Sequence, residues 1–176
     1  MPYNVDEYAL LRGVLSIALI TGGVVGTYVD VGNCPRFEVQ FDTEEVEHQE
    51  SRTAERYVDK RITIVKGYTI NYDLDGRSLS NLAMFLQATT SGSVSLLGLT
   101  NMNQEYALRF VEDNKTGSNM QWDFWRATIT PDGSLALVGE NDWAKMSFTA
   151  KSLADLTNHA DSPYLNTMMM TTTTTT

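Results

Sequence analysis

KRITIVKGYTINYDL, residues 60–74, carries the longest strand signal in the chain. Between Ile62 and Leu74 every second residue is apolar except Lys66, and the residues between them are polar except Val65 and Gly67. Successive side chains of a strand point to opposite faces, so this alternation predicts a long β-strand with one apolar and one polar face. A polar second face predicts contact with water, either bulk solvent or a wet channel.

The segments before this strand also favour β-structure. Residues 10–20, 24–31 and 36–42 are rich in apolar and β-branched side chains and are separated by glycine turns. The connection that follows, residues 42–57, holds six acids and two arginines and has no apolar periodicity. This arrangement predicts a hairpin whose two strands are joined by an extended polar loop.

One helix is predicted after the long strand, over residues 78–90. Ser78 is a suitable N-cap, and apolar residues recur at helical spacing on one side. The residues expected to pack this helix on the sheet are Leu79, Leu82, Ala83 and Leu86. Further strands are predicted at residues 93–100, 105–111, 120–129, 135–138 and 145–150.

Eight or nine strands with one helix predict a mainly β fold, a β-sandwich or barrel with one flanking α-helix and a long hairpin loop. The expected organisation is a single β-sandwich domain, residues 10–151. A polar N-terminal arm, residues 1–9, precedes it. A C-terminal arm of low complexity, residues 152–176, follows it and ends in a run of threonines.

Composition excludes several classes of function. The net charge of −9 argues against a protein that grips nucleic-acid phosphates. The single cysteine, Cys34, cannot form an internal disulfide and fits a reducing compartment. The N-terminus is acidic and its apolar run, residues 14–20, is short, so neither a secretory signal nor a membrane span is predicted.

Catalytic, metal and cofactor motifs are not predicted. The two histidines are far apart in sequence, and the paired acids near Glu44 fit a solvated or partner-facing surface better than an active site. Residues 71–82 match only the first half of a calcium-binding loop, because Leu82 stands where a bidentate acid is needed. Three tryptophans favour core or interface anchors over a sugar-binding platform, and they are Trp122, Trp125 and Trp143.

Four features follow one another between residues 10 and 150. They are YVDVGNC at 28–34 leading into a strand, the acidic loop, the long strand, and SNLA at 80–83 in the helix. In this order they resemble the major tail tube protein of long-tailed bacteriophages with non-contractile tails.

The resemblance implies a structural virion protein without enzymatic activity or cofactor. In that family a β-sandwich with a flanking helix forms a ring, usually of six subunits, and the rings stack into a tube for DNA delivery. The implied partners are copies of the chain itself, the tape measure protein, the tail terminator and the tail tip proteins. DNA would pass without specific binding, and no membrane is implied. The protein would be made in the host cytoplasm and reside in the phage tail.

The resemblance assigns roles to two sets of residues. The loop at 42–57 is expected to contact a neighbouring subunit, above all one in the adjacent ring, which would order its charges. Its contact residues are Asp42, Glu44, Glu45, Glu47, Glu50, Arg52, Glu55 and Arg56. The polar face of the long strand is expected to line a negatively charged lumen, through Arg61, Thr63, Thr69, Asn71 and Asp73.

Two other functions remain open at this point. One is a monomeric β-sandwich module that binds a sugar or calcium, in which the acidic loop is a solvated hairpin tip. The other is a ring protein of a bacterial secretion-system tube, which shares the same fold group.

Overall fold

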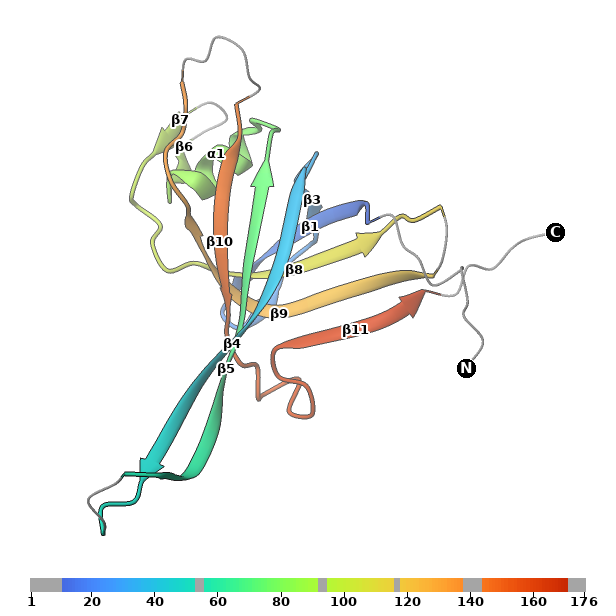
Figure 1. The fold of residues 1–176 in the computed structure, drawn as a ribbon. Coiled ribbons are helices and arrows are strands. Elements are labelled where there is room, and N and C mark those ends of the chain that lie inside the picture. The colour runs from blue at the N-terminus through green and yellow to red at the C-terminus, as the bar shows by residue number, and fades with distance from the viewer. Residues whose placement is uncertain (1–10, 53–55, 92–94, 116–117, 138–143, 171–176) are drawn as a thin grey trace, which may run out of the picture.

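The computed structural model describes residues 11–52, 56–91, 95–115, 118–137 and 144–170. Within them the protein is mainly β with one helix, and a large antiparallel sheet dominates, as predicted (Figure 1). The elements are β1 (Gly13–Thr21), β2 (Val24–Val25), β3 (Val29–Asp30), β4 (Arg36–Gln49), β5 (Val58–Leu74), α1 (Leu79–Phe85), β6 (Thr89–Ser91), β7 (Ser95–Leu97), β8 (Glu105–Glu112), β9 (Asn119–Pro131), β10 (Met146–Ser152) and β11 (Leu165–Met170).

The large sheet has the strand order β2-β1-β8-β9-β10-β5-β4, with β3 also on β1 and β11 also on β9. Figure 1 shows β10, β5 and β4 crossing the direction of β8 and β9. The sheet curls so that its two parts face each other. Phe37 of β4 stacks on Phe110 of β8 with ring centroids 4.7 Å apart, and Tyr68 of β5 meets Phe124 of β9 at 6.2 Å. The result resembles a β-sandwich made from one bent sheet.

The core fills the space between the two parts of the curled sheet. Tyr72 of β5 stacks on Phe148 of β10 with centroids 5.0 Å apart, and both side chains are fully buried. The other large fully buried side chains are Phe124, Leu15, Ile70, Leu74, Leu108 and Met146. The apolar face predicted for the long strand is therefore confirmed in its C-terminal half, from Ile70 to Leu74.

The N-terminal half of β5 departs from the prediction because of a β-bulge. Thr43 of β4 pairs with Val65 of β5, and Lys66 is left over between this pair and the next. One extra residue moves every following side chain to the other face of a strand. Ile62 and Ile64 therefore lie on the face opposite the core and are 51% and 46% exposed. The prediction of one continuous apolar face is wrong for these two residues.

The acidic connection is a pair of strands, so the prediction of an extended loop over residues 42–57 is wrong for most of its length. β4 continues to Gln49, and β5 is already paired with it at Val58. We call residues 43–49 and 58–66 the arm (Figure 1). Seven residues of strand at about 3.4 Å each carry it about 24 Å from the body. No alternation of hydropathy marks residues 43–49 as a strand, because both faces of the arm meet water.

The arm begins where β5 loses a neighbour. β10 pairs with β5 as far as Lys151 and Thr69, and β10 ends at Ser152. Beyond that point β5 pairs only with β4 among the described strands. The two strands then leave the sheet together as a ribbon.

Helix α1 is shorter than predicted and turned about its axis. Ser78 is its N-cap, as predicted, and its Oγ accepts a hydrogen bond from the Asn81 amide at 3.1 Å. The helix ends at Phe85, and residues 89–90 of the expected helix belong to β6. Leu79 and Leu86 are exposed, so the prediction that they pack on the sheet is wrong. Leu82 is half-buried and packs on the core, and Ala83 is half-buried.

A buried asparagine accounts for the turn of the helix. Asn81 is 2% exposed, and its Nδ2 donates to the carbonyl oxygens of Val31 at 2.9 Å and Gly76 at 2.8 Å. These bonds hold the Asn81 side of the helix inward, and Met84 and Phe85 are buried with it. A buried amide is favourable when its hydrogen bonds are made in this way.

The remaining differences lie near the termini and in the turns. The prediction of a low-complexity arm over residues 152–176 is wrong for residues 165–170, which form β11 against β9. Residues 24–31 form two short strands, and residues 135–137 form none. The expected N-terminal arm, residues 1–9, lies outside the described residues.

Gly67, beside the bulge, provides a test of the point where the arm leaves the body. Its φ is +121°, and an added Cβ would lie 2.5 Å from Ser152 Oγ. We expect Gly67→Ala to lower the free energy of unfolding by about 2–4 kcal/mol, through backbone strain and the clash together. The matched control is Gly133→Ala, where φ is +84° but nothing lies within 4 Å, with an expected loss of about 1–2 kcal/mol. Equal losses in urea unfolding would contradict the close packing at Gly67.

The orientation of α1 gives a second prediction. Phe85 is 8% exposed and meets Phe148 edge to face with centroids 5.6 Å apart. We expect Phe85→Ala to cost about 3–5 kcal/mol of unfolding free energy, as for other buried phenylalanines. Leu86→Ala, at the exposed next position, should cost less than about 1 kcal/mol. Urea unfolding of the two variants measures both, and the reverse order would show that the helix packs by its leucine stripe after all.

Candidate functional site

The arm is the first candidate surface, and its charges pair within the chain. Lys66 Nζ lies 2.8 Å from Glu44 Oε2 across the two strands. Arg61 lies 2.6 Å from Glu47 and 3.5 Å from Glu45. Cross-strand pairs of opposite charge favour the register in which they form. The prediction that a neighbouring subunit orders the charges is therefore wrong for Glu44, Glu45 and Glu47, because β5 supplies their cations.

These ion pairs shift the pKa values of their members. The hydrogen bond from Lys66 is the main cause that lowers the pKa of Glu44, and the same bond raises the pKa of Lys66. The hydrogen bond to Glu47 raises the pKa of Arg61. All three side chains are exposed, so water screens the pairs and they stabilise the arm only weakly.

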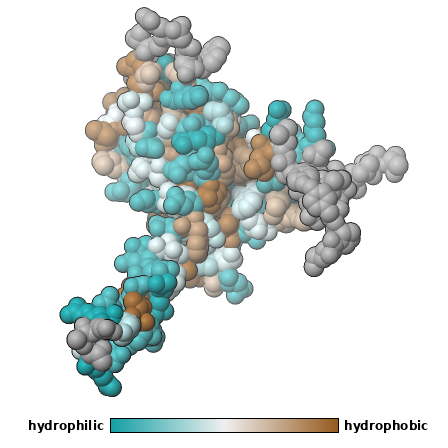
Figure 2. Space-filling view, in the orientation of Figure 1, coloured by the Kyte–Doolittle hydropathy of each residue, from teal (hydrophilic) through white to brown (hydrophobic). Residues whose placement is uncertain are grey.

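One face of the arm carries apolar side chains between the charges. Val46 of β4 pairs with Ile62 of β5, and Ile64 lies two residues further along the same face. We call these three residues the arm strip. They are between 46% and 51% exposed. Figure 2 shows brown atoms within the teal surface of the arm. Thr63, which pairs with Glu45, belongs to the opposite face, which is polar except for Val65 at its base.

The other residues predicted for assembly lie near the tip of the arm or at its base. Asp42 is half-buried and pairs with Gly67 where the arm begins. Glu50 is half-buried in the turn, and Arg52 and Arg56 are exposed there. Glu55 lies outside the described residues.

The five residues predicted to line a lumen do not share one face. Arg61 and Thr63 belong to the polar face of the arm, which continues the core face of the body past the bulge. The remaining three, Thr69, Asn71 and Asp73, lie on the outer face of the body and are half-buried. Asn71 Oδ1 accepts from Thr149 Oγ1 at 2.9 Å, and Asp73 pairs with Arg36 at 2.9 Å. The prediction of one polar face along the whole strand is wrong because of the bulge.

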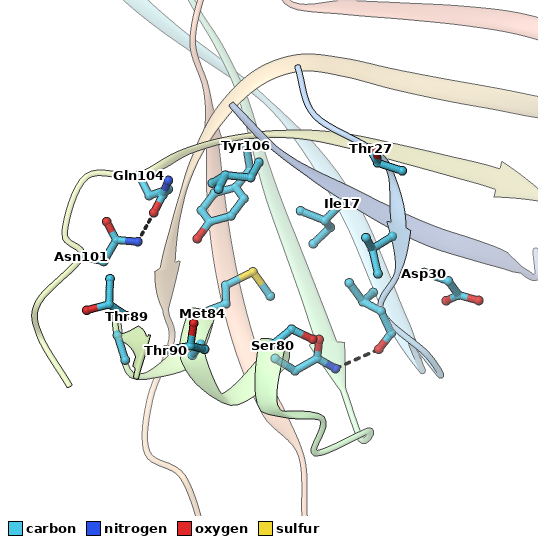
Figure 3. Close-up of a pocket in the computed structure, with 16 residues that line it drawn as sticks. Ile17, Thr27, Asp30, Ser80, Met84, Thr89, Thr90, Asn101, Gln104 and Tyr106 are labelled. Atoms are coloured by element: carbon cyan, nitrogen blue, oxygen red, sulfur yellow. Dashed lines mark hydrogen bonds between the residues drawn. The ribbon is translucent and has the colours of Figure 1, made fainter. Parts of the chain in front are cut away.

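A cavity of about 440 Å³ between α1 and strands β1, β3 and β8 is the second candidate site (Figure 3). Tyr106, Met84 and Ile17 gather around it, whereas the carboxylate of Asp30 points away. At the rim, Asn101 Nδ2 donates to Gln104 Oε1. Burial raises the pKa of the Tyr106 hydroxyl, which therefore stays protonated over the ordinary pH range. An apolar interior with a polar rim is suited to binding an apolar group.

The tryptophans do not form a shared platform. Trp122 packs against the core, and its Nε1 donates to the buried Glu112 at 2.9 Å. Trp125 stacks on His159 with ring centroids 3.7 Å apart, and its Nε1 donates to the Ser162 carbonyl at 2.9 Å. Trp143 lies outside the described residues. No pattern in the sequence pointed to the pairing of Trp125 with His159.

Two further features concern metal binding and the single thiol of the chain. In the described ranges no group of three or more His, Cys, Asp or Glu side chains is placed to hold a metal ion. Cys34 is half-buried and donates its Sγ–H to the Arg36 carbonyl, and burial raises the pKa of its thiol to about 11. No helix in the described part of the chain is long and apolar enough to cross a membrane.

The Glu44–Lys66 pair predicts how the arm responds to pH. Because its pKa is lowered, Glu44 stabilises the arm above the ordinary glutamate pKa, and this is lost as pH falls through the lowered value. Because its pKa is raised, Lys66 contributes below the ordinary lysine pKa, and this is lost as pH rises through the raised value. Hydrogen-exchange protection of the arm amides, corrected for intrinsic rates, should fall at both ends. In Glu44→Gln this pair is absent, so its share of the loss of protection in acid should disappear. A variant whose protection falls in acid as much as that of the wild type would show that the Glu44–Lys66 pair is not the cause.

Comparison with known proteins identifies a family for the chain. No curated protein matches the chain. Residues 8–96, half of the chain, match a family whose description states no function. The matched half includes both strands of the arm and all of α1. On this match, the chain belongs to the family described as "Protein of unknown function UCP028589".

Proposed function

We propose that the chain is a structural virion protein that assembles into stacked rings, six subunits to a ring, and forms the tail tube of a long-tailed bacteriophage. The observation that carries this proposal is the arm. It is a ribbon of two strands that extends about 24 Å from the body, at about 3.4 Å per residue, with both faces exposed and the arm strip on one of them.

An arm of this kind is suited to a contact with another molecule. A two-stranded ribbon has marginal stability in water when nothing packs on it. The surface ion pairs of the arm stabilise it weakly, and the three side chains of the arm strip are about half exposed. Covering the strip with a neighbouring subunit would remove apolar surface from water, which favours association.

Open strand edges add support for assembly between like subunits. In the body, the first residues of β4, from Arg36 to Phe41, pair only with β5 among the described strands. β11 likewise pairs only with β9 among them. Unpaired edges expose backbone groups that can pair with another chain, and a closed ring of identical subunits covers such edges.

The charge of the chain fits a conduit for DNA. In this proposal the acids of a chain with a net charge of −9 give the inner wall of the tube a negative potential. DNA would then slide past, because a basic wall would bind its phosphates with release of counterions. In this proposal the partners of the tube are the tape measure protein, the tail terminator and the tail tip proteins.

The test is to observe the purified chain and two variants by negative-stain electron microscopy and sedimentation. We expect rings or tubes from the wild type. Ile62→Lys places a charge on the arm strip and should reduce the sedimenting fraction at least tenfold, because a desolvated lysine opposes burial of that face. The matched control is Thr63→Lys, the same change at the neighbouring exposed residue on the opposite face, which should assemble like the wild type.

Other outcomes separate the alternatives. A wild-type chain that remains monomeric at high concentration would contradict the proposal and favour a monomeric binding module. Rings alone are also expected of a secretion-system tube protein. Labelling phage particles with an antibody to this chain distinguishes the two, because only a tail tube protein is part of the virion.

A further inference from the structure

The base of the arm is enclosed by side chains from the C-terminal part of the chain. Ser152, the last residue of β10, is buried, and its Oγ accepts a hydrogen bond from the Tyr68 amide at 2.6 Å. An added Cβ at Gly67 would lie 2.5 Å from this oxygen and 3.1 Å from a ring carbon of Tyr164. Gly67 is therefore held between Ser152 and Tyr164 at the point where the arm starts.

The segment between β10 and β11, residues 153–164, is tied to β9 at both of its ends. At one end the Leu153 amide donates to the Arg126 carbonyl at 2.8 Å. At the other end the Trp125 amide donates to the Tyr164 carbonyl at 3.4 Å. We call residues 153–164 the strap.

Contacts within the strap make it compact. The Asp155 amide donates to the Pro163 carbonyl at 2.8 Å, which brings its two ends together. Asn158 Nδ2 donates to the Asp155 carboxylate at 3.1 Å, and His159 stacks on Trp125 of β9. β11 continues from the strap along β9 and fixes where Tyr164 lies.

The strap occupies a gap that the sheet leaves beside the arm. β10 pairs with β9 over residues 127–131, and β11 pairs with the same edge of β9 over residues 119–124. Residues 125–126 of β9 lie between these two contacts and hold the strap. The strap therefore reaches the base of the arm from the side on which β10 has ended (Figure 1).

We propose that the strap is a lock for the arm: when it is seated on β9, Tyr164 and Ser152 close around Gly67 and fix the direction in which the arm points. Without these contacts the arm is joined to the body at a bulge next to a glycine, where the backbone has more freedom than elsewhere in a strand. The arm then pivots at residues 66–67. Few residues are needed for such a hinge.

The lock would make assembly depend on the C-terminal part of the chain. The arm strands precede the strap in the sequence, so they are synthesised before the segment that fixes the direction of the arm. Premature contacts through the arm are disfavoured until β11 has docked. This consequence rests on the proposed function, whereas the coupling between strap and arm does not.

The experiment measures the direction of the arm in dilute, monomeric protein. Spin labels are placed at Thr63→Cys in the arm and Val14→Cys in the body, both exposed positions, in a Cys34→Ser background. Double electron–electron resonance then gives the distribution of distances between the labels. We expect a narrow distribution in this background and one at least twice as wide after Tyr164→Ala. Tyr164→Phe, which keeps the ring at Gly67, is the control and should remain narrow.

A distribution of unchanged width in Tyr164→Ala would overturn the lock. Should that variant fail to fold, hydrogen exchange of the unaltered chain decides instead. The Tyr68 amide bonds to Ser152, and the Trp125 amide bonds to Tyr164. The lock requires both amides to exchange through the same opening, and therefore with the same free energy of opening. Exchange of the Trp125 amide by a separate local opening that leaves Tyr68 protected would overturn it. A wild-type chain that forms no tubes refutes the proposed function but leaves this result unaffected.

Discussion

The end of β10 at Ser152 is the constraint on which the shape of the molecule depends. Up to that residue β5 has a strand on each side and its apolar face is buried in the curled sheet. Beyond it β5 keeps only β4 among the described strands, and the side chains on both faces of the ribbon are exposed. The same ending directs the chain into the strap, so the exposed arm and the segment that encloses its base have one origin.

Sequence periodicity predicted the parts of the fold that have one wet and one dry face. Ile70, Tyr72 and Leu74 alternate with polar residues and are fully buried, as the pattern requires. The β4 strand of the arm, residues 43–49, escaped prediction because both of its faces meet water, where alternation of hydropathy has no physical cause. Its signal was the placement of opposite charges on facing strands, as in Glu44 and Lys66, and that signal requires the register to be known.

The candidate site was predictable in part. The acidic segment was correctly placed on the protein surface, but the helix face was not, because hydropathy favours leucine over asparagine at buried positions. Asn81 is buried since two backbone carbonyls accept its hydrogen bonds, and those carbonyls come from distant residues. β11 was missed for a similar reason: its methionines and threonine gain a strand conformation from pairing with β9, which local sequence does not reveal.

The bulge at Lys66 separates the spacing of residues in β5 from the faces that they occupy. Lys66 has no partner on β4, so Val65 follows Gly67 in the pairing, and β4 sets the faces beyond the bulge. Loss of this one residue would therefore leave Ile64 opposite Glu44 and the arm strip on its present face. Loss of Val65 as well would bring Ile64 opposite Thr43 and exchange the two faces of β5 in the arm, so a homologue two residues shorter here would present its charges where the arm strip now lies.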